Sequence, residues 1–161
     1  MKCLLLLSCL CLLVSGSVTA IPQDGNSIRQ QIQEIVKGKR PGAKLLRKHE
    51  KNPKEVTFVW GADETPNVSN AADNVVATVF YGGTKREAVE RMKSAIDHLA
   101  MGPGQKRTDI GDEAYSWKSE SNGFAGLRFR KANVYVELSG PSESLVNELA
   151  KSITELIPGK E

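Results

Sequence analysis

Apolar residues recur along the chain with two periods, one typical of helices and one typical of strands. Isoleucine and valine at i, i+4, i+7 and i+8 predict a first amphipathic helix over about residues 27–37. A Thr-x-x-Glu capping box that begins at Thr84 predicts a second helix, which extends to about residue 100. A third apolar stripe follows Gly140-Pro141 and predicts the last helix.

The remaining chain contains six short runs that are rich in β-forming residues. Asn52-Pro53 separates the first two runs, and this turn dipeptide predicts a hairpin. Three later runs, joined by tight turns at Asn122-Gly123 and Lys131-Ala132, predict an antiparallel meander. We therefore expect an α+β fold, with a mostly antiparallel sheet of about five or six strands and helices packed on one face.

The first twenty residues differ from the rest of the chain. Lys2 precedes a continuous apolar run, and the small residues Val18-Thr19-Ala20 follow it, a pattern typical of a cleaved signal peptide. The run is about half as long as a spanning helix requires. We expect a secreted or periplasmic protein without residues 1–20, with no transmembrane span in the mature chain. Residues 21–161 would form one domain, in which 21–43 are the N-terminal helix and a basic linker.

The composition argues against several kinds of chemistry. All three cysteines lie in the expected signal peptide, so the mature chain would have no disulfide, no thiolate metal site and no cysteine nucleophile. The two histidines, His49 and His98, belong to no zinc-binding or triad motif. We therefore expect no metal, no cofactor and no catalytic residue. Loss of Lys2 changes the formal net charge only from +3 to +2, which favours no particular partner.

Residues 37–54 form a basic segment that contains eight lysines and arginines and one glutamate. Such a charge density could bind an anionic component of the cell envelope. The candidate binding residues are Lys39, Arg40, Arg47 and Lys48. The alternative, which we favour, is a solvated linker and an edge strand whose lysines discourage aggregation. Nucleic acid is not expected as a partner, because no aromatic residue interleaves with these charges.

The start of the second helix offers a possible anion site. Thr84, Lys85 and Arg86 combine free helix N–H groups with positive charge, an arrangement that suits a phosphate, sulfate or carboxylate. The capping box uses two of the same N–H groups, which favours a structural role.

Acidic residues surround Gly111 just before the meander. Asp109, Asp112 and Glu113 could form an acidic active site, with or without a divalent ion. EF-type calcium binding needs more oxygen ligands at regular spacing than these three provide. The interpretation we favour is a hinge at which Gly111 turns the chain from loop to strand, and Tyr115 and Trp117 then share one face of that strand.

Alternation along the meander separates two sets of side chains. Val134, Val136 and Leu138 share one face of the last strand, so Tyr135 and Glu137 lie on the other. Arg128 and Arg130 alternate in the same way with their apolar neighbours. If helices cover only one face, Tyr135, Arg128 and Arg130 could bind an apolar or sugar-like ligand on the opposite face.

Residues 111–140 contain a Gly-Asp-Glu-Ala-Tyr turn and then a hairpin of the form Phe-Arg-Lys-x-Asn-Val. This stretch resembles small exported bacterial domains of unknown function. The resemblance implies a secreted or periplasmic location and no particular catalytic residue. We expect an exported, non-enzymatic domain that binds a ligand or an envelope partner. The alternatives are a carboxylate-dependent hydrolase and a purely structural envelope protein. In a eukaryotic chain, Asn67 in Asn67-Val68-Ser69 would be a glycosylation sequon.

Overall fold

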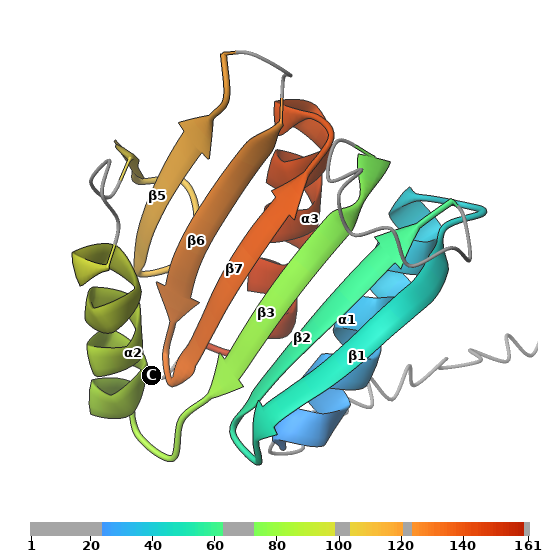
Figure 1. Cartoon of the computed structure of the whole chain (residues 1–161). Coiled ribbons are helices and arrows are strands. Elements are labelled where there is room, and N and C mark those ends of the chain that lie inside the picture. Colours follow the sequence, from blue (N-terminus) through green and yellow to red (C-terminus); the bar gives the residue numbers. More distant parts are fainter. Residues whose placement is uncertain (1–23, 63–72, 99–103, 121–123, 160–161) are drawn as a thin grey trace, which may run out of the picture.

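The computed structural model describes residues 24–62, 73–98, 104–120 and 124–159. The expected signal peptide and the Asn67 sequon lie outside these residues. Within them the chain forms an α+β fold with one mostly antiparallel sheet, as the sequence predicts (Figure 1). The elements are α1 (Gly25–Lys39), β1 (Lys44–Asn52), β2 (Glu55–Gly61), β3 (Val75–Tyr81), α2 (Lys85–Asp97), β4 (Gln105–Arg107), β5 (Glu113–Lys118), β6 (Ala125–Lys131), β7 (Val134–Gly140) and α3 (Glu143–Leu156).

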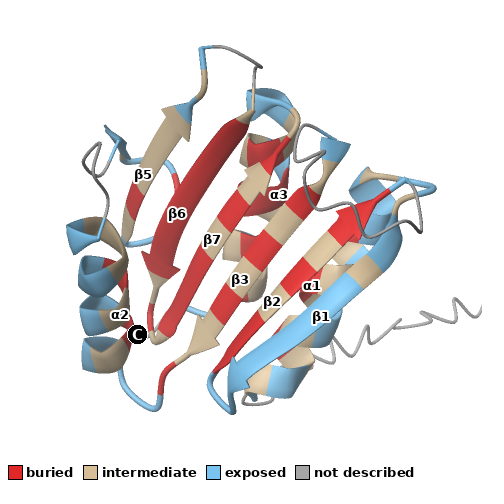
Figure 2. Ribbon diagram, in the orientation of Figure 1, coloured by how far each residue is buried: buried red, intermediate tan, exposed pale blue. Residues whose placement is uncertain are grey.

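The sheet has seven strands in the order β1-β2-β3-β7-β6-β5-β4, and every neighbouring pair is antiparallel. Six of them correspond to the predicted runs. The seventh, β4, is only three residues long and lies just after a glycine- and proline-rich break. β1 and β4 are the two edge strands, and Figure 2 shows that β1 is exposed along most of its length.

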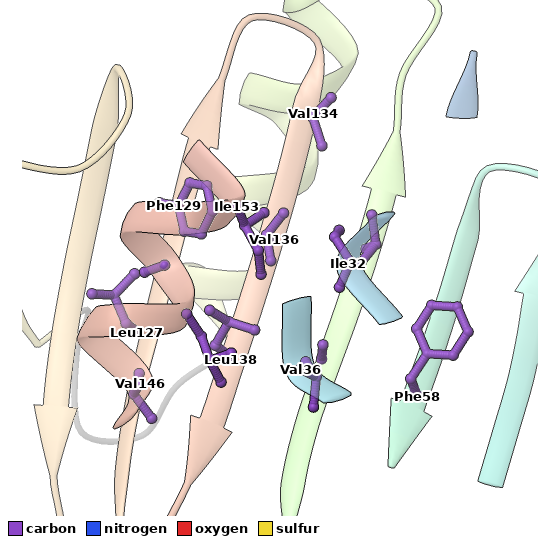
Figure 3. Packing of buried hydrophobic residues seen from close by; sticks show 14 of the residues in the cluster. Ile32, Val36, Phe58, Leu127, Phe129, Val134, Val136, Leu138, Val146 and Ile153 are labelled. Atoms are coloured by element: carbon purple, nitrogen blue, oxygen red, sulfur yellow. The ribbon is translucent and has the colours of Figure 1, made fainter. Parts of the chain in front are cut away.

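The hydrophobic core lies between the sheet and two helices, α1 and α3, on what we call the core face. Alternate residues of the central strands point into it, because side chains of a strand alternate between the two faces. Figure 3 shows Leu127 and Phe129 of β6 with Val136 of β7, close to Ile153 of α3 and Ile32 of α1. All five side chains are fully buried.

The second helix packs against the opposite side of the sheet, which we call the outer face, so the expectation that the helices pack on one face holds only for α1 and α3. Arg91 of α2 binds Glu55 and lies over Tyr135, and both of these alternate with core residues on their strands. In Figure 1, α1 and α3 lie behind the sheet, whereas α2 is in full view. The buried residues of α2 are only Ala88 and Met92, whereas Val89, predicted on its apolar face, is 37% exposed.

The capping box at the start of α2 forms as the sequence predicts. Thr84 Oγ1 accepts a hydrogen bond from the backbone N–H of Glu87 at 3.2 Å, and the Glu87 carboxylate accepts one from the backbone N–H of Gly83 at 2.9 Å. Asp24 and Ser142 cap α1 and α3 in the same way through their side-chain oxygens. Polar groups at the N-termini of all three described helices are therefore satisfied locally.

Candidate ligand-binding face

The outer face is covered by α2 at one end only, as far as the described residues go. Tyr135 lies under α2 and is fully buried. Farther along the strands, the register sets Arg128 opposite Glu137 and Trp117 opposite Gly126. Several outer-face side chains in this second half remain partly exposed: Tyr115, Trp117, Glu137, Ser139, Thr78 and Val76. The aromatic and charged side chains of this half are the candidate site.

Trp117 packs against the neighbouring strand β6. Its indole ring is 4.3 Å from the guanidinium carbon of Arg128. It also lies so close to Gly126 that a Cβ atom at that position would overlap the ring. Trp117 therefore packs against Gly126, which has no side chain, and against the guanidinium of Arg128, and it stays partly exposed.

Arg128, whose guanidinium stacks on this ring, is almost wholly buried, with 3% of its surface exposed. Its Nη2 donates a hydrogen bond to Glu137 Oε1 at 3.4 Å, whereas Nε and Nη1 are buried and have no partner among the described residues. Stacking on Trp117 compensates part of the cost of burying these donors. The sequence-based expectation that Arg128 lies exposed on a binding face is wrong, because Arg128 is buried and its guanidinium stacks on Trp117.

Tyr135 joins Glu137 to the α2 end of the face. The Tyr135 hydroxyl donates to Glu137 Oε2 at 2.9 Å, and the guanidinium carbon of Arg91 lies 5.1 Å from the Tyr135 ring. Arg91 also binds Glu55 through two hydrogen bonds of 2.6 and 3.1 Å. Burial opposes ionisation of Glu55, but the hydrogen bonds and charge of Arg91 outweigh it and lower the pKa of this carboxyl. Tyr135 is therefore buried in an ionic network rather than exposed to a ligand, contrary to the expectation from alternation.

A second ionic network fixes the acidic hinge. Arg130, which is only 7% exposed, donates through Nη1 to Asp112 Oδ2 at 2.8 Å, and its Nη2 lies 3.7 Å from Glu113. Asp112 Oδ2 also accepts the backbone N–H of Ala132 at 3.0 Å, in the turn between β6 and β7. Glu113 accepts a hydrogen bond from the hydroxyl of Tyr115 at 3.2 Å. Arg130 is thus a buried structural cation, not the exposed binding residue that alternation suggested.

Gly111 turns the chain here, in agreement with the hinge interpretation. Its φ is +59°, and a Cβ atom would come within 2.5 Å of the backbone oxygen of Arg130. The third acid of the set, Asp109, points elsewhere and forms a two-point ion pair with Arg107, at 2.9 and 2.7 Å. The hydrogen bonds from Arg107 lower the pKa of Asp109. No three acidic, histidine or cysteine residues within the described ranges are grouped so that they could hold a metal.

The basic segment does not form one patch. Arg47 pairs in register with Val59 on the outer face, whereas the next residue, Lys48, lies beside Phe58 on the core face. Lys48 pairs with Glu50 at 2.7 Å, and Lys39, at the end of α1, lies 3.6 Å from Glu148. Arg40 caps α1. The lysine-rich edge strand, with two register irregularities, therefore fits the solvated-edge interpretation.

The possible anion site at Thr84, Lys85 and Arg86 is occupied by the chain itself. Thr84 caps α2, and the Glu87 carboxylate binds both Gly83 and the ammonium of Lys54, the latter at 2.7 Å. A shallow pocket beside Gly83 is lined by residues of α1 and of the β1–β2 turn. The pocket contains two cations, Arg29 and Lys54, and both are engaged. Arg29 donates to the Pro53 carbonyl at 2.8 Å, and Lys54 binds Glu87.

Comparisons with family models, with curated proteins and with solved structures find no match for this chain. The described part of the chain contains no helix that is long and apolar enough to cross a membrane. Sequence reasoning missed Gly126, Arg91 and Glu55 as parts of the outer face. Arg91 could have been suspected, since it lies three residues after the buried Ala88 and so falls on the edge of the buried side of α2.

Alkaline pH is expected to destabilise the protein through Tyr135. Burial, followed by the nearby Glu137 carboxylate, raises the pKa of the Tyr135 hydroxyl well above its ordinary value. The folded state therefore keeps a proton that the unfolded chain releases above about pH 10, and stability should fall by up to about 1.4 kcal/mol per pH unit in that range. Urea unfolding across that range measures the slope. Tyr135→Phe should reduce it, and an unchanged slope would exclude Tyr135 as the cause.

Proposed function

We propose that the protein is an exported, non-catalytic binding domain that holds its ligand against Trp117 on the outer face. One observation carries the proposal: a large, partly exposed aromatic side chain packs against Gly126 and Arg128, which restrict its movement. An aromatic ring that is already held in place loses little conformational freedom on binding, so stacking contributes more fully to affinity.

The acidic residues support a binding role more than a hydrolytic one. A carboxylate-dependent hydrolase needs two carboxylates that face one substrate. Asp109 and Asp112 instead bind Arg107 and Arg130, respectively, and Asp112 also secures a turn. In a purely structural protein, replacement of Trp117 would abolish no ligand binding, and this difference between the two functions is testable.

Two-dimensional nuclear magnetic resonance can test the proposal directly. The chain has two tryptophans, and Trp60 is buried in the core at 3% exposure, so the indole N–H signal of Trp117 can be assigned with a Trp117→Phe variant. The probes are 1-naphthoate, 1-naphthamide, 1-naphthylmethylammonium and a methyl glucoside. We expect at least one probe to shift the Trp117 signal and the signals of neighbouring β5 and β6 residues.

The matched variants are Trp117→Ala and Val59→Ala. Val59 also lies on the outer face and is partly exposed, but it is on β2, on the far side of β3 and β7 from Trp117. Trp117→Ala should abolish the shifts, and Val59→Ala should leave them unchanged. If no probe shifts the Trp117 signal at millimolar concentration, or if both variants behave alike, the proposed function is wrong.

A further inference from the structure

We infer that the ligand stacked on Trp117 is a planar ring with an anionic group such as a carboxylate, and that Lys106 binds the anionic group. This inference rests on the proposed function and specifies its ligand. Two observations carry it: the positive charge of Arg128 against the indole ring, and the position of Lys106 on the neighbouring edge strand.

The guanidinium carbon of Arg128 lies 4.3 Å from the centroid of the indole ring, in the position where a cation interacts with the negative face of an aromatic ring. Arg128 is buried whereas Trp117 is partly exposed, so we infer that the guanidinium lies on the less exposed side of the ring. A second cation on the outer side would meet the repulsion of this buried charge across the ring. An electron-rich or anionic ring on the outer side would instead be attracted to it.

Two positive groups lie close to Trp117 on the outer face: Arg128, which stacks on the ring, and Lys106 on the neighbouring strand β4. Glu137 on β7 lies opposite Arg128. The Glu137 carboxylate accepts hydrogen bonds from Tyr135 on one oxygen and from Arg128 on the other, so both oxygens are already engaged.

Glu113 is the second carboxylate of this part of the face, and it lies 3.7 Å from Arg130. Both carboxylates therefore face an arginine, whereas Lys106 adds a further positive charge beside Trp117. The surroundings of a ligand on Trp117 are therefore positively charged.

Lys106 lies within reach of a ligand on Trp117. Lys106 pairs with Tyr115 in the β4–β5 register, so both lie on the outer face, and Trp117 is the next residue of β5 on that face. Such diagonal neighbours are about 7–8 Å apart, within reach of a lysine side chain and a ligand substituent. Lys106 is exposed, and in the described part of the chain its ammonium has no ion-pair partner. Its charge is therefore available to a ligand.

The test compares three naphthalene probes that differ in charge but share one ring. We expect 1-naphthoate to bind about two- to fivefold more tightly than neutral 1-naphthamide, as one surface-charge contact would give. We expect 1-naphthylmethylammonium to bind most weakly. Dissociation constants follow from titration of the Trp117 indole signal. Added salt should weaken the binding of naphthoate and leave that of naphthamide unchanged, because salt screens an exposed charge.

Lys106→Gln should bring the affinity for naphthoate close to that for naphthamide, without a change for naphthamide. Lys93→Gln is the matched control, since Lys93 is an exposed lysine of α2. Thermal unfolding of both variants should match that of the wild type. Equal affinity for all three probes, tighter binding of the cation, or an unaltered naphthoate affinity in Lys106→Gln would each overturn the inference but leave the proposed function intact. Failure of every probe would instead remove the proposed function.

Discussion

Gly126→Ala is expected to lower the free energy of unfolding by about 2 kcal/mol and to displace Trp117 from its position. The new methyl group would overlap the indole ring, so the ring has to leave the surface of β6. Its stacking on Arg128 is then lost, and overpacking of this kind costs about 1–3 kcal/mol. The lower entropy of alanine in the unfolded chain offsets only about 0.4–1 kcal/mol. Urea unfolding measures the stability, and the Trp117 indole signal reports the displacement.

Gly38→Ala is the control for this substitution. Gly38 lies in α1, and a Cβ atom there would have nothing within 4 Å. Alanine at this position should stabilise the protein by about 0.5–1 kcal/mol, because glycine is a poor helix former. If Gly126→Ala proved as harmless as Gly38→Ala, Trp117 would not be held against β6, and the proposed binding surface would lose its basis.

Local pattern was enough to predict the class of fold and the side of the sheet on which most strand residues lie. Tyr135, Arg128 and Arg130 are on the face opposite Val136 and Phe129, as alternation requires. Their burial could not be predicted in the same way. It depends on α2 and on Trp117, which come from other parts of the chain, and periodicity within a strand does not show what covers it.

The sequence pattern predicts α2 as a helix but does not predict which face of the sheet it covers. A capping box and an apolar stripe correctly predict a helix that starts after Thr84. Which face of the sheet the helix covers depends on its partners. α2 has a narrow apolar stripe with Arg91 at its edge. The helix packs where Arg91 can bind Glu55 and lie over Tyr135. β4 escaped prediction for a related reason, since a three-residue strand is defined by its pairing with β5 rather than by its own sequence.

The acidic hinge could be predicted in outline but not in its partners. Glycine at position 111 and the acids around it indicate a turn, and the positive φ of Gly111 agrees. The partner of Asp112 is Arg130, 18 residues later, and Asp112 also fixes the backbone of Ala132, whose φ is +50°. These long-range contacts make Asp112 part of the β6–β7 turn, a role that its own neighbourhood in the sequence does not reveal.

Glu55→Gln is expected to lower the free energy of unfolding by about 2 kcal/mol at neutral pH. The substitution keeps the size of the side chain but removes the negative charge that faces Arg91, which is itself only 23% exposed in its side chain. Loss of one partner from a mostly buried ion pair leaves the other charge uncompensated, and this cost exceeds that of losing an exposed pair. Because the pKa of Glu55 is lowered in the folded state, its contribution is present above about pH 4.5 and disappears as the pH falls. The variant should therefore lose less stability than the wild type on acidification. Urea unfolding at neutral pH and below about pH 4.5 measures this difference.

Glu50→Gln provides a matched control from the neighbouring strand. Glu50 pairs with Lys48 at the surface, where both side chains are at least half exposed, so its substitution should leave stability unchanged. The double variant Glu55→Leu with Arg91→Met should be more stable than either single variant, since it removes both charges together and keeps the apolar contacts of α2. If Glu55→Gln were as neutral as Glu50→Gln, the Glu55–Arg91 pair could not be what holds α2 on the outer face. The apolar contacts of Ala88 and Met92 would then have to account for the position of this helix.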